Sequence, residues 1–212
     1  MRDTRRSWLL ALPVLALLIW TVAFPNVAVV FGSFEEGLGH WRDFFASPAD
    51  REALSTSIFI SVASVIASLL IGVPLAFLLS RFEFPGRKAL RIVATLPAAL
   101  PPLVGVIAFL FLYSESGVFT RAGQRGFGLD EAPWRLTGVW AIVFVHAYTM
   151  YVYVFLFVSA GLERFDTTLD EAASGLGASS WQRLRKVTLP LLTPALAGSM
   201  LLVFMTSLGS FS

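Results

Sequence analysis

Five long stretches of the sequence contain no Asp, Glu, Lys or Arg. They are Ser7–Phe34, Ala53–Ser80, Ile92–Ser114, Leu136–Leu162 and Val187–Ser212. A helix needs roughly 20 apolar residues to cross the hydrocarbon core of a bilayer, and each stretch is long enough. Because a lipid-embedded segment must satisfy its own backbone hydrogen bonds, these stretches should be helices. A β-barrel would show shorter segments of alternating polarity, which are not visible here. The sequence therefore predicts an all-α integral membrane protein with five transmembrane helices.

The expected helices span about 8–31, 54–80, 92–114, 137–162 and 187–212, all within one transmembrane domain that covers residues 1–212. The first could instead be a cleaved signal peptide, because Arg2, Arg5 and Arg6 precede it. It is about twice as long as the usual apolar core of a signal, and no clear cleavage site follows it. We therefore interpret it as a helix that remains in the protein.

The amino-acid composition excludes several classes of function. The chain is 56% hydrophobic and 14% charged, whereas a soluble domain is about 25% charged. This excludes a disordered chain, a basic nucleic-acid-binding protein and most soluble enzymes. The absence of cysteine excludes a disulfide framework, a thiolate metal site and a cysteine nucleophile. The two histidines argue against a His-rich metal cluster. We therefore expect no catalytic residue, no metal and no cofactor.

The distribution of basic residues predicts the orientation. Eleven of the 16 lie in the N-terminus and in the segments 81–91 and 163–186. Basic residues favour cytoplasmic loops, so the N-terminus should be cytoplasmic and the loops around 35–52 and 115–135 should face outward. Five spans then leave the C-terminus outside. Because the chain stops at Ser212 at the end of an apolar run, we expect a truncation, with at least one further span missing.

The predicted spans hold no clearly buried charged residue, although ion-coupled pumps usually do. His146 is the one titratable candidate at mid-span, and it permits two interpretations. It is either a neutral imidazole bonded to a neighbouring helix or a residue that lines a pathway. Other candidates for the pathway are Tyr148 and Tyr151 in the same span and Ser207 and Ser210 in the last.

Two further patterns concern helix packing. Ser57, Ser61, Ser64, Ser68 and Gly72 recur at helical spacing, so they share one face of the second span and predict close packing. The third span contains three prolines, which should break or kink it. They are Pro97, Pro101 and Pro102. Such a kink would suit a gated pathway, but it is also common in spans that merely bend.

The polar segment 163–186 predicts a helix, a sharp turn and a second helix. Thr168, with Glu171 three residues later, fits a capping box at the start of the first helix. Gly175 and Gly177 can end it, because glycine adopts the left-handed cap conformation without strain. Ser179 and Gln182 form a second possible capping box, and Pro190 falls in the first turn of the last span. The alternative is a polar loop with two incidental helical turns.

At these residues the chain resembles the permease subunits of binding-protein-dependent ABC importers, which have the type I permease fold. Their cytoplasmic motif reads E-A-A, three residues, G, nine residues, I or V, one residue, then L-P. The matching residues are Glu171, Ala172, Ala173, Gly177, Val187, Leu189 and Pro190. Every spacing agrees, and the motif lies where the charge pattern independently places a cytoplasmic loop.

The resemblance extends less sharply to three other segments. They are 84–88, 100–105 and 207–212. These are similar to the iron(III), 2-aminoethylphosphonate, thiamine and polyamine group of permeases, in some of which two six-helix modules are fused. The chain would then be most of one module, and iron(III) or 2-aminoethylphosphonate would be its substrate.

The family implies a permease that performs no chemistry of its own. Thr168, Glu171, Ala172, Ala173, Gly177, Leu189 and Pro190 would form the coupling region. This region would dock on a cytoplasmic ABC ATPase dimer, and ATP binding would drive the spans between inward-open and outward-open states. The other implied partners are a periplasmic or lipoprotein substrate-binding protein, a second permease module and the lipid bilayer. The implied location is the bacterial cytoplasmic (inner) membrane, with no role for nucleic acid.

Three other functions compete with this interpretation. An ion-coupled secondary transporter or channel would show an intramembrane charge pair or an inverted repeat, and neither is visible. A membrane-embedded enzyme would need paired carboxylates, a zinc motif or an activated serine, and no His–carboxylate partnership is apparent. An exporter subunit would have long helical cytoplasmic loops, whereas these are short.

Overall fold

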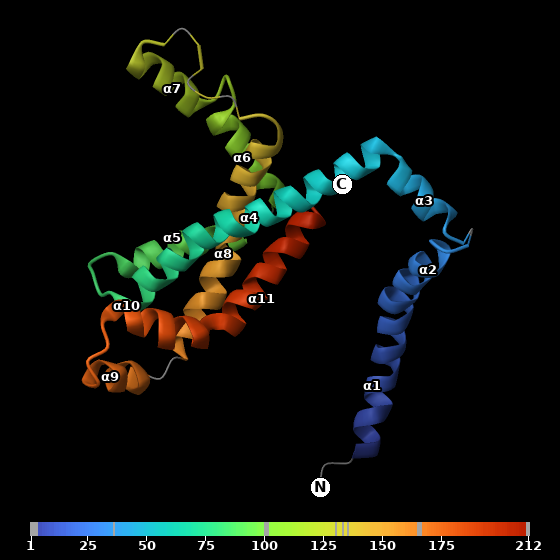
Figure 1. Ribbon diagram of the computed structural model, residues 1–212, viewed down its shortest axis with the longest axis horizontal. Helices are drawn as coiled ribbons and strands as arrows, with labels where there is room; N and C mark the ends of the chain where they lie inside the picture. Colours follow the sequence, from blue (N-terminus) through green and yellow to red (C-terminus); the bar gives the residue numbers. More distant parts are fainter. Residues whose placement is uncertain are drawn as a thin grey trace. The chain divides into compact units, whose positions relative to one another are not determined.

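The computed structural model describes residues 4–35, 37–99, 102–129, 131–132, 134, 136–164 and 167–210. Throughout these residues the regular structure is helical (Figure 1), which confirms the all-α fold class. The α-helices are α1 (Thr4–Leu18), α2 (Phe24–Gly32), α3 (Gly39–Ala46), α4 (Pro48–Arg81), α5 (Arg87–Ala99), α6 (Pro102–Tyr113), α7 (Val118–Phe127), α8 (Gly138–Glu163), α9 (Thr167–Gly175), α10 (Ser180–Arg183) and α11 (Leu189–Leu208). Two π-helical turns, η1 (Ile19–Ala23) and η2 (Leu184–Thr188), join α1 to α2 and α10 to α11.

Five helical segments are long and apolar enough to cross a membrane. They are Ala11–Gly32, Pro48–Arg81, Val104–Phe127, Gly138–Glu163 and Ser180–Leu208. The third differs most from the span expected at 92–114. Two helices occupy that stretch, because α5 ends at Ala99 and α6 begins at Pro102. Pro97 lies inside α5, and Pro102 is the first residue of α6. Residue 100 lies outside the described residues, so the expected break at the prolines stays a prediction. Pro101 itself lies outside the described residues.

The chain divides into two compact units, residues 1–55 and 56–212. In the first unit, α2 and the described side chains of α1 bury almost nothing. Trp20, Val29 and Phe31 are all more than two-thirds exposed. A helix that is apolar on every side and unburied is suited to contact with lipid, where its backbone groups remain satisfied internally.

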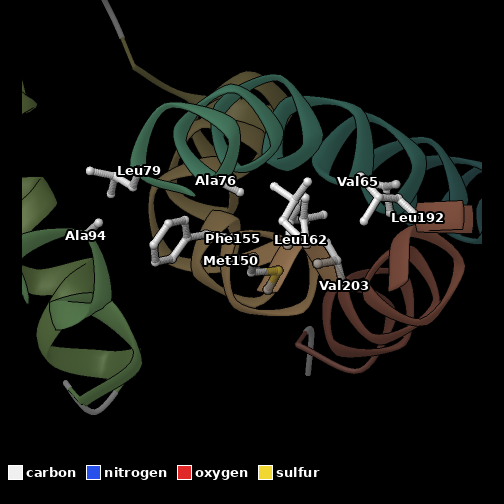
Figure 2. Close-up of a cluster of buried hydrophobic side chains, with 11 residues drawn as sticks. Val65, Ala76, Leu79, Ala94, Met150, Phe155, Leu162, Leu192 and Val203 are labelled. Carbon is white, nitrogen blue, oxygen red and sulfur yellow. The ribbon is translucent and has the colours of Figure 1, made fainter. Parts of the chain in front are cut away.

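The core of the second unit lies where α4, α5, α8 and α11 meet. Side chains that point toward one another from these helices form one apolar cluster (Figure 2). Phe155 and Val158 of α8, Leu79 of α4 and Val203 of α11 are all at most 1% exposed. Since α8 contributes the largest share of this cluster, it is the central helix on which the others pack.

The expected small-residue face of α4 is buried against α8. Ser61, Ser64 and Ser68 are all 0% exposed. A Cβ placed on Gly72 would lie 2.7 Å from the carbonyl oxygen of Tyr151 and 2.7 Å from the Cβ of Val154. Both distances are shorter than atomic contact allows, so only glycine permits the two backbones to approach this closely. The predicted packing role is confirmed.

Replacement of Gly72 by valine should therefore separate α4 from α8. Overpacking of a rigid contact costs about 1–3 kcal/mol or more, so we expect a lower melting temperature in detergent and less protein in the membrane. Gly126→Val is the matched control, because nothing lies within 4 Å of a Cβ at that position. A Gly72→Val protein as stable as the control would contradict the close approach.

Candidate functional site

The polar segment between α8 and α11 folds into a compact helix–turn–helix, seen at one end of the second unit (Figure 1). Helix α9 begins at Thr167, so Thr168 lies within its first turn and not at the N-cap. The capping box predicted for Thr168 and Glu171 is therefore misplaced, and the true cap position falls outside the described residues. Glu171 and Ala172 are exposed, and Ala173 is partly buried.

A Schellman motif ends α9. The N–H of Ala178 donates to the carbonyl of Ala173 at 3.0 Å, and the N–H of Gly177 donates to the carbonyl of Ser174 at 2.9 Å. This pair of bonds requires a left-handed residue at the C′ position. Gly177 supplies it, with a φ of +81°. The predicted glycine turn is confirmed, and Gly177 is the residue that makes it.

The second helix of the segment is capped as predicted. The side chain of Ser179 accepts from the backbone N–H of Gln182 at 3.3 Å, and the Gln182 side chain accepts from the N–H of Ser179 at 2.8 Å. Arg183 of α10 then forms an ion pair with Asp170 of α9, at 3.6 Å. Both side chains are about one-quarter exposed, so the pair joins the two short helices into one unit.

The π-helical turn η2 connects this unit to α11. The N–H of Leu189 reaches back five residues to the carbonyl of Leu184. Pro190 has no N–H to offer the carbonyl of Lys186, so a regular α-helical ladder is interrupted here in any case. Leu189 and Pro190 form the first turn of α11.

Two exposed apolar side chains of the segment escaped the sequence analysis. Leu176, next to the turn, is 89% exposed, and Trp181 on α10 is 66% exposed. Leu176 could have been identified from the sequence, because it is a leucine between two glycines in a polar loop. Exposed apolar groups of this size on a polar segment are typical of a surface that binds another protein.

A cavity of about 720 Å³ lies among α6, α8, the end of α5 and the C-terminal end of α11. Polar groups that line it include His146, Tyr148, Thr149, Tyr153, Thr206 and Ser210. Aromatic rings of Phe109 and Tyr113 form another wall, stacked on each other with ring centroids 4.6 Å apart. No charged side chain is among the described residues that line this cavity.

His146 joins three helices at one edge of the cavity. Its Nδ1 lies 3.0 Å from the Oγ of Ser64 on α4 and 3.1 Å from the Oγ of Ser207 on α11. Its Nε2 lies 3.2 Å from the Oγ of Ser210. The Ser210 hydroxyl donates to the carbonyl of Ser207 at 2.7 Å, so it can only accept from Nε2–H. Nδ1 is then the acceptor for both other hydroxyls, which assigns the Nε2–H tautomer.

The other predicted pathway residues divide into two groups. Tyr148 and Ser210 line the cavity with His146. Tyr151 does not, because its hydroxyl donates to the carbonyl of Ala94 at 3.1 Å and ties α8 to α5. Ser207 is 2% exposed and is not among the lining residues, although it bonds to His146 and Ser210, which are. The sequence analysis assigned Ser64 to packing and did not foresee its bond to His146.

The part of the chain that the structure describes contains no group of three His, Cys, Asp or Glu residues placed to hold a metal ion. The described residues therefore offer three features that bear on function: the helix–turn–helix of α9 and α10, the uncharged cavity beside His146 and the apolar helices.

Comparison with known families matches residues 68–212 to the binding-protein-dependent transport system inner membrane component. The chain belongs to this family. The match includes the whole of α9, the Gly177 turn and α10, so the resemblance drawn from the E-A-A motif is confirmed. Membership in this family, together with five apolar helices, makes the chain a multi-pass membrane protein.

Several curated members of the family are similar over most of the chain. A probable sulfate transport permease, cysT of Chlorokybus atmophyticus, is 29% identical across 97% of this chain and 70% of its own length. The sulfate permease CysW of Escherichia coli K12 is 30% identical across 88% of this chain and 62% of its own. The molybdenum permease ModB of Mycobacterium tuberculosis is 30% identical across 94% and 72%.

The chain is shorter than the permeases it matches. It spans 28% of a probable ABC transporter permease, y4fN of Sinorhizobium fredii, at 31% identity. Among solved structures, a bacterial alginate ABC transporter in complex with alginate-bound periplasmic protein superposes with a TM-score of 0.75, over 95% of this chain and 73% of the other. At 21% identity this likeness shows the fold alone. The names of cysT and CysW specify sulfate, that of ModB specifies molybdenum, and that of y4fN specifies no substrate, so the expected iron or aminoethylphosphonate group is not confirmed.

Proposed function

We propose that the chain is a permease subunit of an ATP-driven, binding-protein-dependent importer and forms part of the substrate pathway. ATP hydrolysis belongs to a separate cytoplasmic ABC ATPase dimer. A periplasmic or lipoprotein binding protein delivers substrate, and a second permease module completes the pathway. The N-terminus is cytoplasmic, as the basic residues predict. The observation that carries this proposal is the Glu171–Gly177 motif, folded as a helix that ends in a glycine turn.

The helix–turn–helix acts as the coupling element. Exposed Ala172 has little side-chain bulk, so a partner can approach α9 closely, and Glu171 offers a carboxylate to a basic residue of that partner. Leu176 and Trp181 add apolar contact area. The Arg183–Asp170 ion pair and the Schellman turn make α9 and α10 move together, so displacement by the ATPase reaches α11 through η2.

The uncharged cavity beside His146 forms part of the substrate pathway. Its imidazole, hydroxyl and backbone groups can exchange hydrogen bonds with a solute without holding it as tightly as a buried ion pair would. The sulfate and molybdenum named for relatives favour a solute with anionic oxygens. We therefore rank an oxyanion, such as sulfate, molybdate or a phosphonate, ahead of iron(III), for which the described cavity lining offers no carboxylate.

The test is reconstitution of the full-length permease with its ATPase and binding protein in sealed vesicles. We expect uptake of radiolabelled sulfate or molybdate to require ATP and the binding protein, and to persist when an uncoupler collapses the proton gradient. Uptake that needs the gradient but not ATP would instead establish the alternative, an ion-coupled secondary transporter. Competition by iron(III) citrate or 2-aminoethylphosphonate tests the other substrates.

A further inference from the structure

A second hollow, separate from the cavity beside His146, lies on the surface of the second unit. It is a groove of about 660 Å³ formed by the last turns of α8, the first turns of α11 and one residue of α9. Its walls are almost entirely apolar, with Leu156 and Phe157 from α8, Leu191 and Ala195 from α11 and Leu169 from α9. The only charged side chain that lines it among the described residues is Arg164.

The charged side chain lies at one end of the groove. Arg164 is the C-cap residue of α8, and Leu156 lies two turns deeper in the same helix. At a rise of 1.5 Å per residue, the groove therefore extends about 12 Å along α8 below the guanidinium. One leaflet of the hydrocarbon core is about 15 Å deep. The groove thus has the depth of a single leaflet, with a cation at the level of its headgroups.

The groove remains accessible within this unit. Leu191 is 52% exposed and Phe157 is 41% exposed, although both are large and apolar. An occupant of this groove must cover the apolar walls, which water would leave unsatisfied, and must offer an anionic group to Arg164. A lipid satisfies both, because its acyl chain covers the walls and its phosphate pairs with a guanidinium, often through two parallel hydrogen bonds.

We propose that this groove binds an anionic phospholipid, with one acyl chain between α8 and α11 and the headgroup phosphate on Arg164. Basic pockets between transmembrane helices at the cytoplasmic surface are suited to such headgroups. This proposal rests on the proposed function in one respect. The cytoplasmic placement of α9 identifies the cytoplasmic leaflet as the one that supplies the lipid. Because Leu169 belongs to α9, the bound lipid contacts the coupling element as well as the membrane helices.

The experiment uses quenching by brominated lipids. The chain has no cysteine, so Leu191→Cys gives a single attachment point for a fluorophore in a transporter whose other subunits are made cysteine-free. Leu201→Cys is the matched control, since Leu201 is 62% exposed on the same helix but lies outside the groove. Each labelled transporter is reconstituted in phosphatidylcholine that contains either brominated phosphatidylglycerol or brominated phosphatidylcholine as the minor component.

At position 191 we expect phosphatidylglycerol to quench with about fivefold higher apparent affinity than phosphatidylcholine, the preference that one basic residue confers. At position 201 the two lipids should quench equally. Arg164→Gln should abolish the preference at 191, whereas Lys88→Gln, which removes an exposed charge from α5 outside the groove, should preserve it.

Two results would overturn the proposal. Equal quenching by both lipids at position 191 would show that Arg164 selects no headgroup. No quenching by either lipid at 191, with normal quenching at 201, would show that protein fills the groove. Either result can occur in a transporter with full ATP-dependent uptake, so failure of the lipid site is distinguishable from failure of the proposed function.

Discussion

Replacement of Gly177 by valine should strongly reduce ATP-driven uptake while the protein remains in the membrane. Gly177 has a φ of +81°, and left-handed backbone costs an L-residue roughly 1–2 kcal/mol, more when the side chain is β-branched. Valine there would break the Schellman bonds and release α10 from α9. Nothing lies within 4 Å of a Cβ at this position, so the effect is one of backbone conformation and not of crowding.

The measurements are uptake and binding-protein-stimulated ATPase activity per reconstituted transporter, with sulfate or molybdate as the solute, whichever the wild type carries. We expect uptake to fall about tenfold or more, in line with the loss of roughly 1.4 kcal/mol or more of coupling. Gly177→Asn is the control, because asparagine tolerates the left-handed region and should retain most of the activity. Wild-type uptake by Gly177→Val at equal abundance would refute the coupling assignment.

Replacement of His146 by leucine should have the second large effect. It removes the acceptor of the Ser64 and Ser207 hydroxyls and the donor to Ser210. A buried hydroxyl that loses its partner costs about 1–3 kcal/mol, so we expect a lower melting temperature. Because Nε2–H is directed to the cavity edge at Ser210, we also expect uptake per folded transporter to fall about tenfold.

The two readouts separate the roles that the sequence left open for this histidine. If His146 only packs helices, the melting temperature falls but uptake per folded molecule does not change. If it serves the pathway, both fall. Ser64→Ala is the matched control, because it removes one buried partner of the imidazole and leaves the Nε2–Ser210 bond intact. It should lower stability without a comparable loss of uptake.

The helix–turn–helix of α9 and α10 was predictable because its signals are local. A glycine turn depends on the φ of one residue, and a capping box depends on two residues three positions apart, so Gly177 and the Ser179–Gln182 pair could be assigned from their order in the chain. The error at Thr168 concerns the start of a helix, since a residue within the described helix was predicted to be its N-cap.

The arrangement of the cavity was not predictable, since it depends on which helices are neighbours. Ser64 and Ser207 are separated by 82 and 61 residues from His146, and no spacing rule relates them. Tyr148 and Tyr151 lie close to one face of α8 by helical period, yet one lines the cavity and the other bonds to α5. That difference arises from the position of Ala94, which the sequence of α8 does not contain.

The π-helical turn η2 fixes the rotational phase between the α9–α10 segment and α11. It holds one residue more than an α-helical turn would, and each residue of a helix advances the chain by about 100° around the axis. Because a π-helical turn closes over five residues and not four, η2 absorbs its additional residue with little rotation. A further residue inserted beside 184–188 in α-helical geometry would instead turn α9 and α10 through about 100° relative to α11. Every contact within the loop would survive, but its docking surface would face a different direction. If the proposed function holds, the length of this five-residue turn therefore determines the direction from which the ATPase docks.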